Sequence, residues 1–182
     1  MKRTRGAAAV AAAVAAVALL IPHPAAAATA PVSTPAAARQ YYPDVDHLTC
    51  EINKERARLG LPPLLVSDRA DDVGRGHARD MASMERLTSV GSDGRNLRTR
   101  LSDAGVFSER VYEFMFSGYD NDDYFADMAT DPSPNNSFYK AVTSRDFAAW
   151  GLGYDRTYWD VNLLGPHRRL DARSAVCAPG SS

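Results

Sequence analysis

Apolar residues recur at helical spacing in two segments between residues 44 and 84. The first segment has apolar side chains three, four and seven positions apart, at Val45, Leu48, Ile52 and Leu59. Asp44 can cap its start and Gly60 its end. The second segment, which Ser67 can cap, carries one stripe of mostly apolar residues: Ala70, Val73, His77, Met81 and Met84. The spacing predicts two amphipathic helices.

A third, shorter helix is predicted after the Asp93-Gly94 turn, where Leu97, Leu101 and Ala104 share a face and Gly105 ends the pattern. A fourth is predicted from a cap within Asp120-Asn121-Asp122 through Met128. The segment Asp131–Ser137, which contains two prolines, is predicted to be irregular.

Strand patterns dominate the rest of the second half. Val111–Phe116 is β-branched and aromatic, which predicts a short strand or a buried extended segment. Ala149–Tyr154 and Tyr158–Leu164 are two apolar, aromatic runs joined by Asp155-Arg156-Thr157, a pattern typical of a hairpin. Helices followed by strands around one core predict an α+β domain with helices packed on an antiparallel sheet.

The N-terminus has the layout of a secretory signal peptide over residues 1–30. Met1–Arg5 is basic, Ala7–Ile21 is apolar, and Ala28-Thr29-Ala30 offers a cleavage site. An uncleaved membrane anchor is the alternative, but the apolar run is short and rich in alanine. We therefore expect a secreted, extracellular protein. A flexible Pro/Ala-rich lead-in over 31–43, one domain over 44–166 and a C-terminal tail over 167–182 would follow.

The balance of basic and acidic residues limits the kinds of partner that the protein can bind. The chain has 21 basic and 22 acidic residues, and three of the bases lie in the leader: Lys2, Arg3 and Arg5. The remainder is mildly acidic, which argues against nucleic-acid binding because no basic excess is present to release counterions from phosphate. No segment after the leader is long and apolar, so we expect no stable membrane insertion after cleavage. We also expect the protein to be a monomer.

Only two cysteines are present, Cys50 and Cys177. An even number in an exported chain favours one disulfide, and this one would close a loop of more than a hundred residues. Two free, buried thiols are the alternative.

The order of several motifs resembles the CAP superfamily, the domain of cysteine-rich secretory, antigen 5 and pathogenesis-related 1 proteins, in its bacterial branch. The matching pieces run in order through residues 44–165: CEINKERARLGLPPL at Cys50–Leu64, HARDM at His77–Met81, SDGR at Ser92–Arg95, Arg100-Leu101 with Ala104-Gly105, GLGY at Gly151–Tyr154 and YWDVNLLG at Tyr158–Gly165. The resemblance implies an α-β-α sandwich with a large cleft and export from the cell.

In many members the cleft binds a divalent metal through two histidines and one or two glutamates, a donor set that suits Zn²⁺. Aligned with that pattern, the histidine positions fall on Ser89 and Phe138, and only the glutamate is retained, as Glu113. The histidines after the leader are His47, His77 and His167, none at a ligand position. We therefore expect no metal and no other cofactor.

These departures favour a non-catalytic domain whose cleft binds a small apolar ligand or a partner protein. One alternative is a secreted hydrolase in which His77 activates Ser89, with Asp80 or Asp93 as the orienting acid. Another is a purely structural domain of the cell envelope. Glu113 itself can serve either as a ligand contact or as a carboxylate that fixes its own surroundings through hydrogen bonds.

Overall fold

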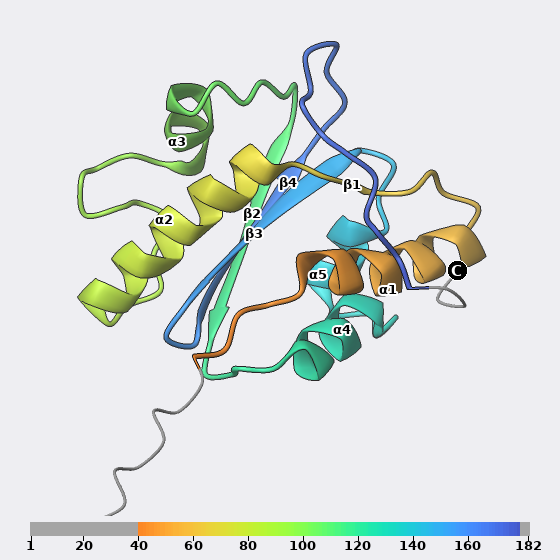
Figure 1. Cartoon of the computed structure of the whole chain (residues 1–182), viewed down its shortest axis with the longest axis horizontal. Helices are drawn as coiled ribbons and strands as arrows, with labels where there is room; N and C mark the ends of the chain where they lie inside the picture. The colour runs from red at the N-terminus through yellow and green to blue at the C-terminus, as the bar shows by residue number, and fades with distance from the viewer. Residues whose placement is uncertain (1–39, 179–182) are drawn as a thin grey trace, which may run out of the picture. The chain divides into compact units, whose positions relative to one another are not determined.

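The computed structural model describes residues 40–178, so the predicted signal peptide lies outside the described residues. Within this range no helix has both the length and the apolar character needed to cross a membrane. The helices and strands follow one another along the chain (Figure 1) as α1 (Val45–Arg58), β1 (Leu65–Val66), α2 (Asp68–Met84), α3 (Leu97–Asp103), β2 (Val111–Ser117), α4 (Asp122–Thr130), α5 (Ser137–Val142), β3 (Ala149–Asp155) and β4 (Tyr158–Leu164).

The predicted helices and their N-terminal caps are confirmed. Asp44 accepts a hydrogen bond from the His47 amide at the start of α1, and Ser67 caps α2 in the same way. Asn121, the middle residue of the predicted cap, caps α4. Two elements were not predicted: the two-residue strand β1, and α5, which Asn136 caps at the end of the proline-containing segment.

The sheet has four strands in the order β1-β3-β4-β2. The hairpin between β3 and β4 is confirmed, and its turn places Arg156 and Thr157 at φ of 46° and 72°. Strand β2 pairs antiparallel with β4, as expected. Strand β1 pairs with β3 in parallel, so the sheet is mixed.

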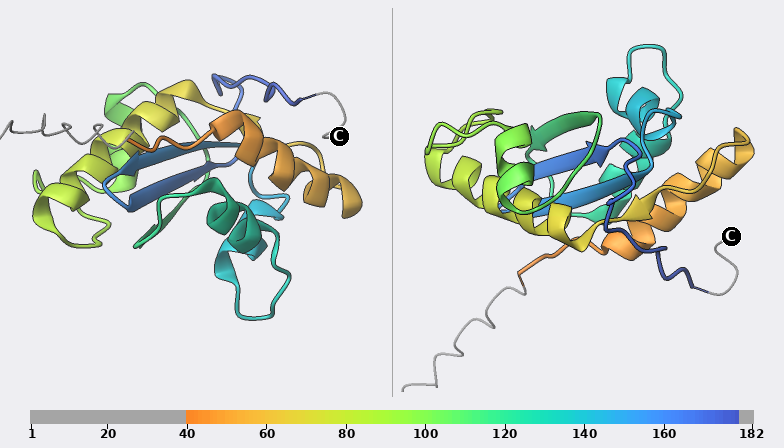
Figure 2. Two further views of the ribbon diagram at one scale, coloured as in Figure 1. Left: turned by 60° about the horizontal axis from the view of Figure 1, so that its bottom comes forward. Right: turned by 90° about the horizontal axis from the view of Figure 1, so that it is seen from above.

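Helices cover both faces of the sheet. Figure 2 shows α2 on one face, and α4 and α5 on the other. The main core lies on the α4–α5 side, where α1 also packs, and includes Leu48, Ile52, Phe125, Phe138, Trp150 and Trp159. A smaller core lies on the α2–α3 side around Ala70, Leu101 and Leu164. The expected α-β-α sandwich is therefore the observed architecture.

Helix α2 lies directly against β3 at two glycines of the strand. A Cβ atom added to Gly153 would be 1.8 Å from the carbonyl carbon of Gly74, and one added to Gly151 would be 2.3 Å from that of Ala70. Only glycine at these strand positions permits this approach. The contact fixes where α2 lies on the sheet, and with it the side chains that α2 presents at its edges.

Arg56 joins α1 to two connections elsewhere in the fold. Its guanidinium is buried and donates hydrogen bonds to four backbone carbonyl oxygens, those of Pro62, Val142, Ser144 and Phe147. Pro62 lies in the connection before β1, Val142 ends α5, and Ser144 and Phe147 lie in the connection before β3. Their carbonyl oxygens would otherwise lack partners in the interior.

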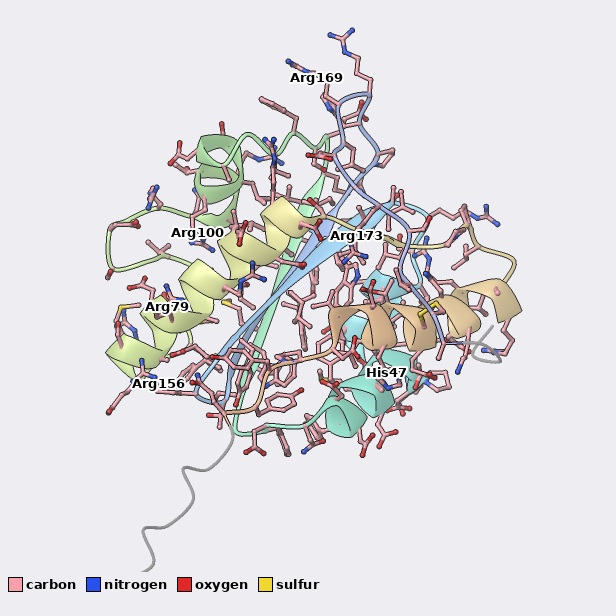
Figure 3. The ribbon with its side chains drawn as sticks, in the orientation of Figure 1. His47, Arg79, Arg100, Arg156, Arg169 and Arg173 are labelled. Carbon is pink, nitrogen blue, oxygen red and sulfur yellow. A yellow bond between two sulfur atoms is a disulfide. The ribbon has the colours of Figure 1, made fainter. Side chains whose placement is uncertain are left out.

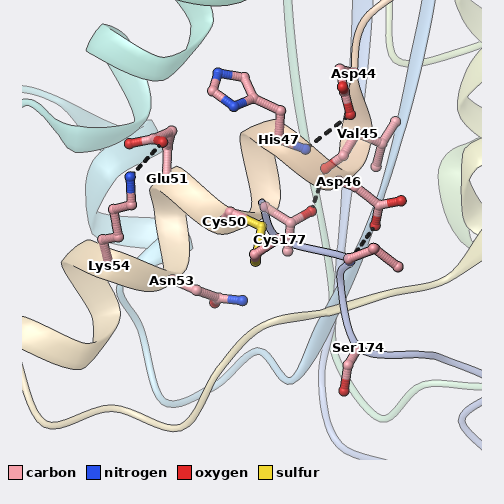
Figure 4. Close-up of a disulfide and its surroundings, with 12 residues drawn as sticks. Asp44, Val45, Asp46, His47, Cys50, Glu51, Asn53, Lys54, Ser174 and Cys177 are labelled. Carbon is pink, nitrogen blue, oxygen red and sulfur yellow. Dashed lines mark hydrogen bonds and ion pairs between the residues drawn. A yellow bond between two sulfur atoms is a disulfide. The ribbon is translucent and has the colours of Figure 1, made fainter. Parts of the chain in front are cut away.

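The predicted disulfide between Cys50 and Cys177 is confirmed, and it spans 127 positions (Figure 4). It attaches the C-terminal segment to α1. Arg173 holds the same segment through ion pairs with Asp46 and Asp68, and its backbone forms a bridge with Val66. Residues 167–178 of the predicted tail thus include a segment that packs along α1 and β1.

Replacing Gly153 by alanine is expected to lower the free energy of unfolding by about 3 kcal/mol or more, because the new methyl group would overlap the α2 backbone. Gly76→Ala in α2 is the matched control, since its Cβ would meet nothing within 4 Å. It should gain up to about 1 kcal/mol from helix propensity. Urea unfolding of both variants measures the difference, and equal stability would contradict the close contact.

Removing both cysteines, as Cys50→Ala with Cys177→Ala, is expected to lower the free energy of unfolding by about 3–5 kcal/mol, because the long loop is no longer closed in the unfolded chain. Arg173→Ala is the control that loosens the same segment, with an expected loss of about 1 kcal/mol or less, because its ion pairs are exposed. Two titratable thiols in the unreduced, denatured protein would contradict the bridge.

Candidate functional site

A cleft of about 490 Å³ opens between α2, α3 and the connection of residues 85–96 that joins them. Helix α2 contributes one stripe to its wall, because Asp72, Gly76 and Asp80 follow one another at intervals of four residues. Gly76 leaves space in the middle of this stripe, since no atom lies within 4 Å of its Cβ position. The remaining wall comes from the connection and from α3, and it combines charged side chains with apolar surface.

Side chains of the wall hold the 85–96 connection in place. His77 Nε2 lies 2.7 Å from the carbonyl oxygen of Thr88. Asp80 accepts from the backbone N and the hydroxyl of Ser92, at 2.7 and 2.6 Å. Arg100, in the middle of α3 (Figure 3), donates to the carbonyl oxygens of Ser89 and Arg95 at 3.2 and 2.8 Å. The shape of the cleft therefore depends on these three side chains.

Behind the wall lies a buried polar cluster of five residues: His77, Arg100, Glu113, Asp160 and Asn162. Arg100 Nη2 donates to Glu113 Oε1, and each of these two side chains is only 9% exposed. His77 Nε2 lies 3.9 Å from the same carboxylate oxygen. Asn162 Nδ2 donates to Asp160 Oδ2 at 3.3 Å. The cluster thus joins α2 and α3 to two strands.

Strand register explains why these residues meet. Glu113 of β2 pairs directly with Asn162 of β4, and Met115 pairs with Asp160. Paired residues of neighbouring strands point to the same face, and residues two apart along a strand do so as well. Glu113, Asp160 and Asn162 therefore share the face that α2 covers, and Asn162 Nδ2 lies 3.1 Å from the Cβ position of Gly74.

Burial sets the protonation of the cluster. It raises the pKa of Asp160 well above its usual range, and the neighbouring Glu113 raises that pKa further. Burial also raises the pKa of Glu113, but Arg100 opposes the shift. Since Arg100 contacts Glu113 directly, we assign the negative charge to Glu113 and the proton to Asp160. The cluster then contains one carboxylate matched by one guanidinium.

His77 is neutral in this setting. Burial, and secondarily the charge of Arg100, lowers its pKa. Because its Nε2 faces a carbonyl oxygen, Nε2 carries the proton and Nδ1 is left as an acceptor. Nδ1 is buried with no hydrogen-bond partner, as are Arg100 Nε and Asn162 Oδ1. The protonated Asp160 instead hydrogen-bonds to the Glu113 carboxylate.

Of the three residues predicted from the family alignment, Ser89 and Glu113 both contact Arg100. Arg100 contacts the Glu113 carboxylate and the backbone carbonyl oxygen of Ser89. Ser89 itself is exposed. Phe138 lies across the sheet, in α5, where it is buried and stacks on Phe114 with ring centroids 4.6 Å apart. Phe114 follows Glu113 on β2 and so points to the opposite face. Phe138 therefore does not meet the other two.

The other histidines lie apart from this cluster. His47 is exposed on α1, and His167 packs beside Phe107 in the connection after β4. Sequence reasoning did not assign roles to Arg100, Asp160 or Asn162. A signal for two of them was present, because Asp160 and Asn162 are polar residues two apart in an otherwise apolar strand. Such spacing indicates a polar patch on one buried face.

The residues present do not fit the metal site found in many relatives. Among residues 40–178, no three His, Cys, Asp or Glu side chains are grouped so that they could hold a metal ion. The three aligned positions do not form one site, because Phe138 lies on the opposite face of the sheet, and the Glu113 carboxylate is paired with Arg100. The donors at these three positions are therefore unsuited to a divalent metal of the family type.

The architecture defines the class of protein: an α-β-α domain with a cleft beside one sheet-covering helix. The profile of the CAP family, described as the cysteine-rich secretory protein family, matches residues 50–160, more than half of the chain. The protein therefore belongs to the CAP family. A search of curated proteins gave no match.

Solved structures share the fold at low sequence identity. An extracellular SCP-domain protein from Bacillus anthracis aligns with a TM-score of 0.57 and 18% identity, over 66% of this chain and 40% of that one. A cysteine-rich secretory protein from Staphylococcus aureus gives 0.51 and 15%, over 65% and 37%. An outer surface protein from Borrelia burgdorferi gives 0.53 and 20%, over 66% and 90%. The match thus spans well under half of the first two proteins.

Replacing Glu113 by glutamine is expected to lower the free energy of unfolding by about 3 kcal/mol, because Arg100 would remain buried without its counter-charge. Glu109→Gln, at an exposed position just before β2, makes the same chemical change and should shift it by less than about 0.5 kcal/mol. Urea unfolding measures both. Equal stability of Glu113→Gln and the control would mean that the Arg100–Glu113 ion pair does not stabilise the fold around the cleft.

Proposed function

We propose that this protein is an exported CAP-family binding module that takes a small ligand into the α2–α3 cleft without catalysing a reaction on it. The observation that carries the proposal is the cleft itself. His77 and Arg100 of the buried polar cluster hold its wall in place through hydrogen bonds to the 85–96 connection. The cleft volume of about 490 Å³ is within the range of small-molecule sites. A wall held by buried hydrogen bonds is preorganised, which lowers the entropic cost of binding.

The lining favours a polar ligand over the small apolar one expected from the sequence. Four aspartates and two arginines contribute to the wall: Asp72, Asp80, Asp93, Asp103, Arg95 and Arg100. An apolar ligand would remove these charges from water without replacing their hydrogen bonds.

Export is supported by two observations. A disulfide between Cys50 and Cys177 suits an oxidising compartment. Two of the structural relatives are described as an extracellular protein and an outer surface protein. Together with the N-terminal sequence pattern, these observations support a secreted or surface location.

The hydrolase alternative lacks its central contact. A serine nucleophile needs a base within hydrogen-bond reach. His77 Nε2 is engaged by the Thr88 carbonyl oxygen, and Ser89 meets the cluster through its own carbonyl oxygen rather than its hydroxyl. The purely structural alternative would leave the cleft without an occupant, and a variant that fills the cleft separates it from the proposal.

Filling the cleft from within tests the proposal. Gly76→Phe should be tolerated by α2, because the Cβ position is open, and the ring should occupy the cleft. Fragments that shift the backbone amide NMR signals of Gly91 and Ser92 in the parent protein should lose most of their effect, with affinities reduced at least about tenfold. Amide shifts across a set of polar and apolar fragments provide the measurement.

Ser83→Phe, on an exposed position of α2 outside the cleft lining, is the matched control and should bind the fragments as the parent does. Fragments that bind elsewhere, or that bind Gly76→Phe unchanged, would count against a ligand site in the cleft.

A further inference from the structure

The charges along the cleft wall do not cancel. Arg100 is matched by Glu113 behind the wall and so does not offset the aspartates in front of it. Arg95 is shared between Asp93 and Asp103, at 2.7 and 3.0 Å. One guanidinium therefore faces two carboxylates at this end of the cleft, which leaves an excess of negative charge.

Asp80 adds to this excess. Its hydrogen-bond donors are the backbone N and the hydroxyl of Ser92, which are neutral. Among the described residues, no arginine or lysine forms an ion pair with it. The bonds from Ser92 lower the pKa of Asp80, and those from Arg95 lower the pKa of Asp93, so both carboxylates are ionised at neutral pH.

The two carboxylates converge beside Gly91. The Cβ position of this glycine lies 2.9 Å from Asp93 Oδ1 and 3.0 Å from Asp80 Oδ2. A side chain at residue 91 would collide with both oxygens, so only glycine lets the two carboxylates lie this close to the chain at this point. Two negative charges from different elements are thus held at one point of the wall.

An unused acceptor lies in the same wall. His77 contributes to the cleft lining, is only 2% exposed, and has no partner for Nδ1. Since Nε2 carries the proton, Nδ1 can only accept. A buried acceptor without a donor is costly, and a donor supplied by a ligand would relieve that cost.

We propose that the cleft binds a small organic cation through its primary ammonium group, which lies between Asp80 and Asp93, with His77 Nδ1 as a further acceptor for the ligand. An ammonium group offers three hydrogen-bond donors and no acceptor, which matches a wall of carboxylates and an unprotonated imidazole nitrogen. This inference rests on the proposed function, because it names the ligand class of the same cleft.

Three probes with the same four-carbon chain isolate the head group: n-butylammonium, n-butanol and n-butyrate. Amide shifts of Gly91, Ser92 and Gly76 are followed by NMR at low salt, using the full secreted protein. We expect saturable shifts with n-butylammonium that weaken as sodium chloride is raised, and much smaller shifts with the other two. Equal or stronger binding of n-butanol or n-butyrate would overturn the inference.

Charge-neutralising variants locate the contact. Asp80→Asn and Asp93→Asn should each weaken n-butylammonium binding by about fivefold, the effect of losing one solvent-exposed charge. Asp123→Asn, on α4 at the far side of the sheet, makes the same charge change and should have no effect. Unchanged affinity in both cleft variants would overturn the inference.

Calcium chloride is titrated in parallel, because two carboxylates can also attract an inorganic cation. Calcium that displaces n-butylammonium with higher affinity would overturn the inference in favour of a metal site. Failure of n-butylammonium while other fragments still occupy the cleft would reject the inference alone. If neither n-butylammonium nor any fragment binds in the cleft, the proposed function fails as well.

Discussion

The close contact between α2 and β3 determines the rest of this structure. Because Gly151 and Gly153 have no side chains, α2 lies directly on the strand. Side chains of the neighbouring strands must then fit beside the helix. The register places Glu113, Asp160 and Asn162 there, so the α2 face of the sheet is polar at this point, whereas the α4–α5 face is filled with aromatic rings. The candidate site is therefore a consequence of how the two layers pack.

Burying that much polarity has a cost, and the chain offsets it only in part. One proton on Asp160 and one guanidinium from Arg100 leave a single matched charge pair in the interior. Yet three buried polar atoms of the cluster still lack hydrogen-bond partners within the described residues: His77 Nδ1, Arg100 Nε and Asn162 Oδ1. A region shaped by stability alone would satisfy these atoms or replace them with apolar groups. Departures of this kind are expected where binding, rather than packing, has shaped the residues.

The sequence was sufficient for the long elements and insufficient for the short ones. Helices α1 and α2 were predictable because their periodicity and their caps, Asp44 and Ser67, agree. Strand β1 has only two residues and helix α5 only six, too few to establish a period. Glu113 was found through the family pattern. Its partner Arg100 was not, because their contact depends on how α3 packs against β2 and has no local signature.

The Arg100–Glu113 pair also bears on the metal site expected of the CAP family. In a site of two histidines and a glutamate, a divalent cation supplies the positive charge that a buried carboxylate requires. Here Arg100 supplies that charge from within the chain, at Glu113, the carboxylate that the sequence predicts to be retained. A metal ion would have to displace a guanidinium that also holds Ser89 and Arg95 through their carbonyl oxygens, and so would release part of the cleft wall. With Glu113 satisfied internally, the unmatched negative charge of the proposed ligand site lies further out, on the aspartates that face the cleft.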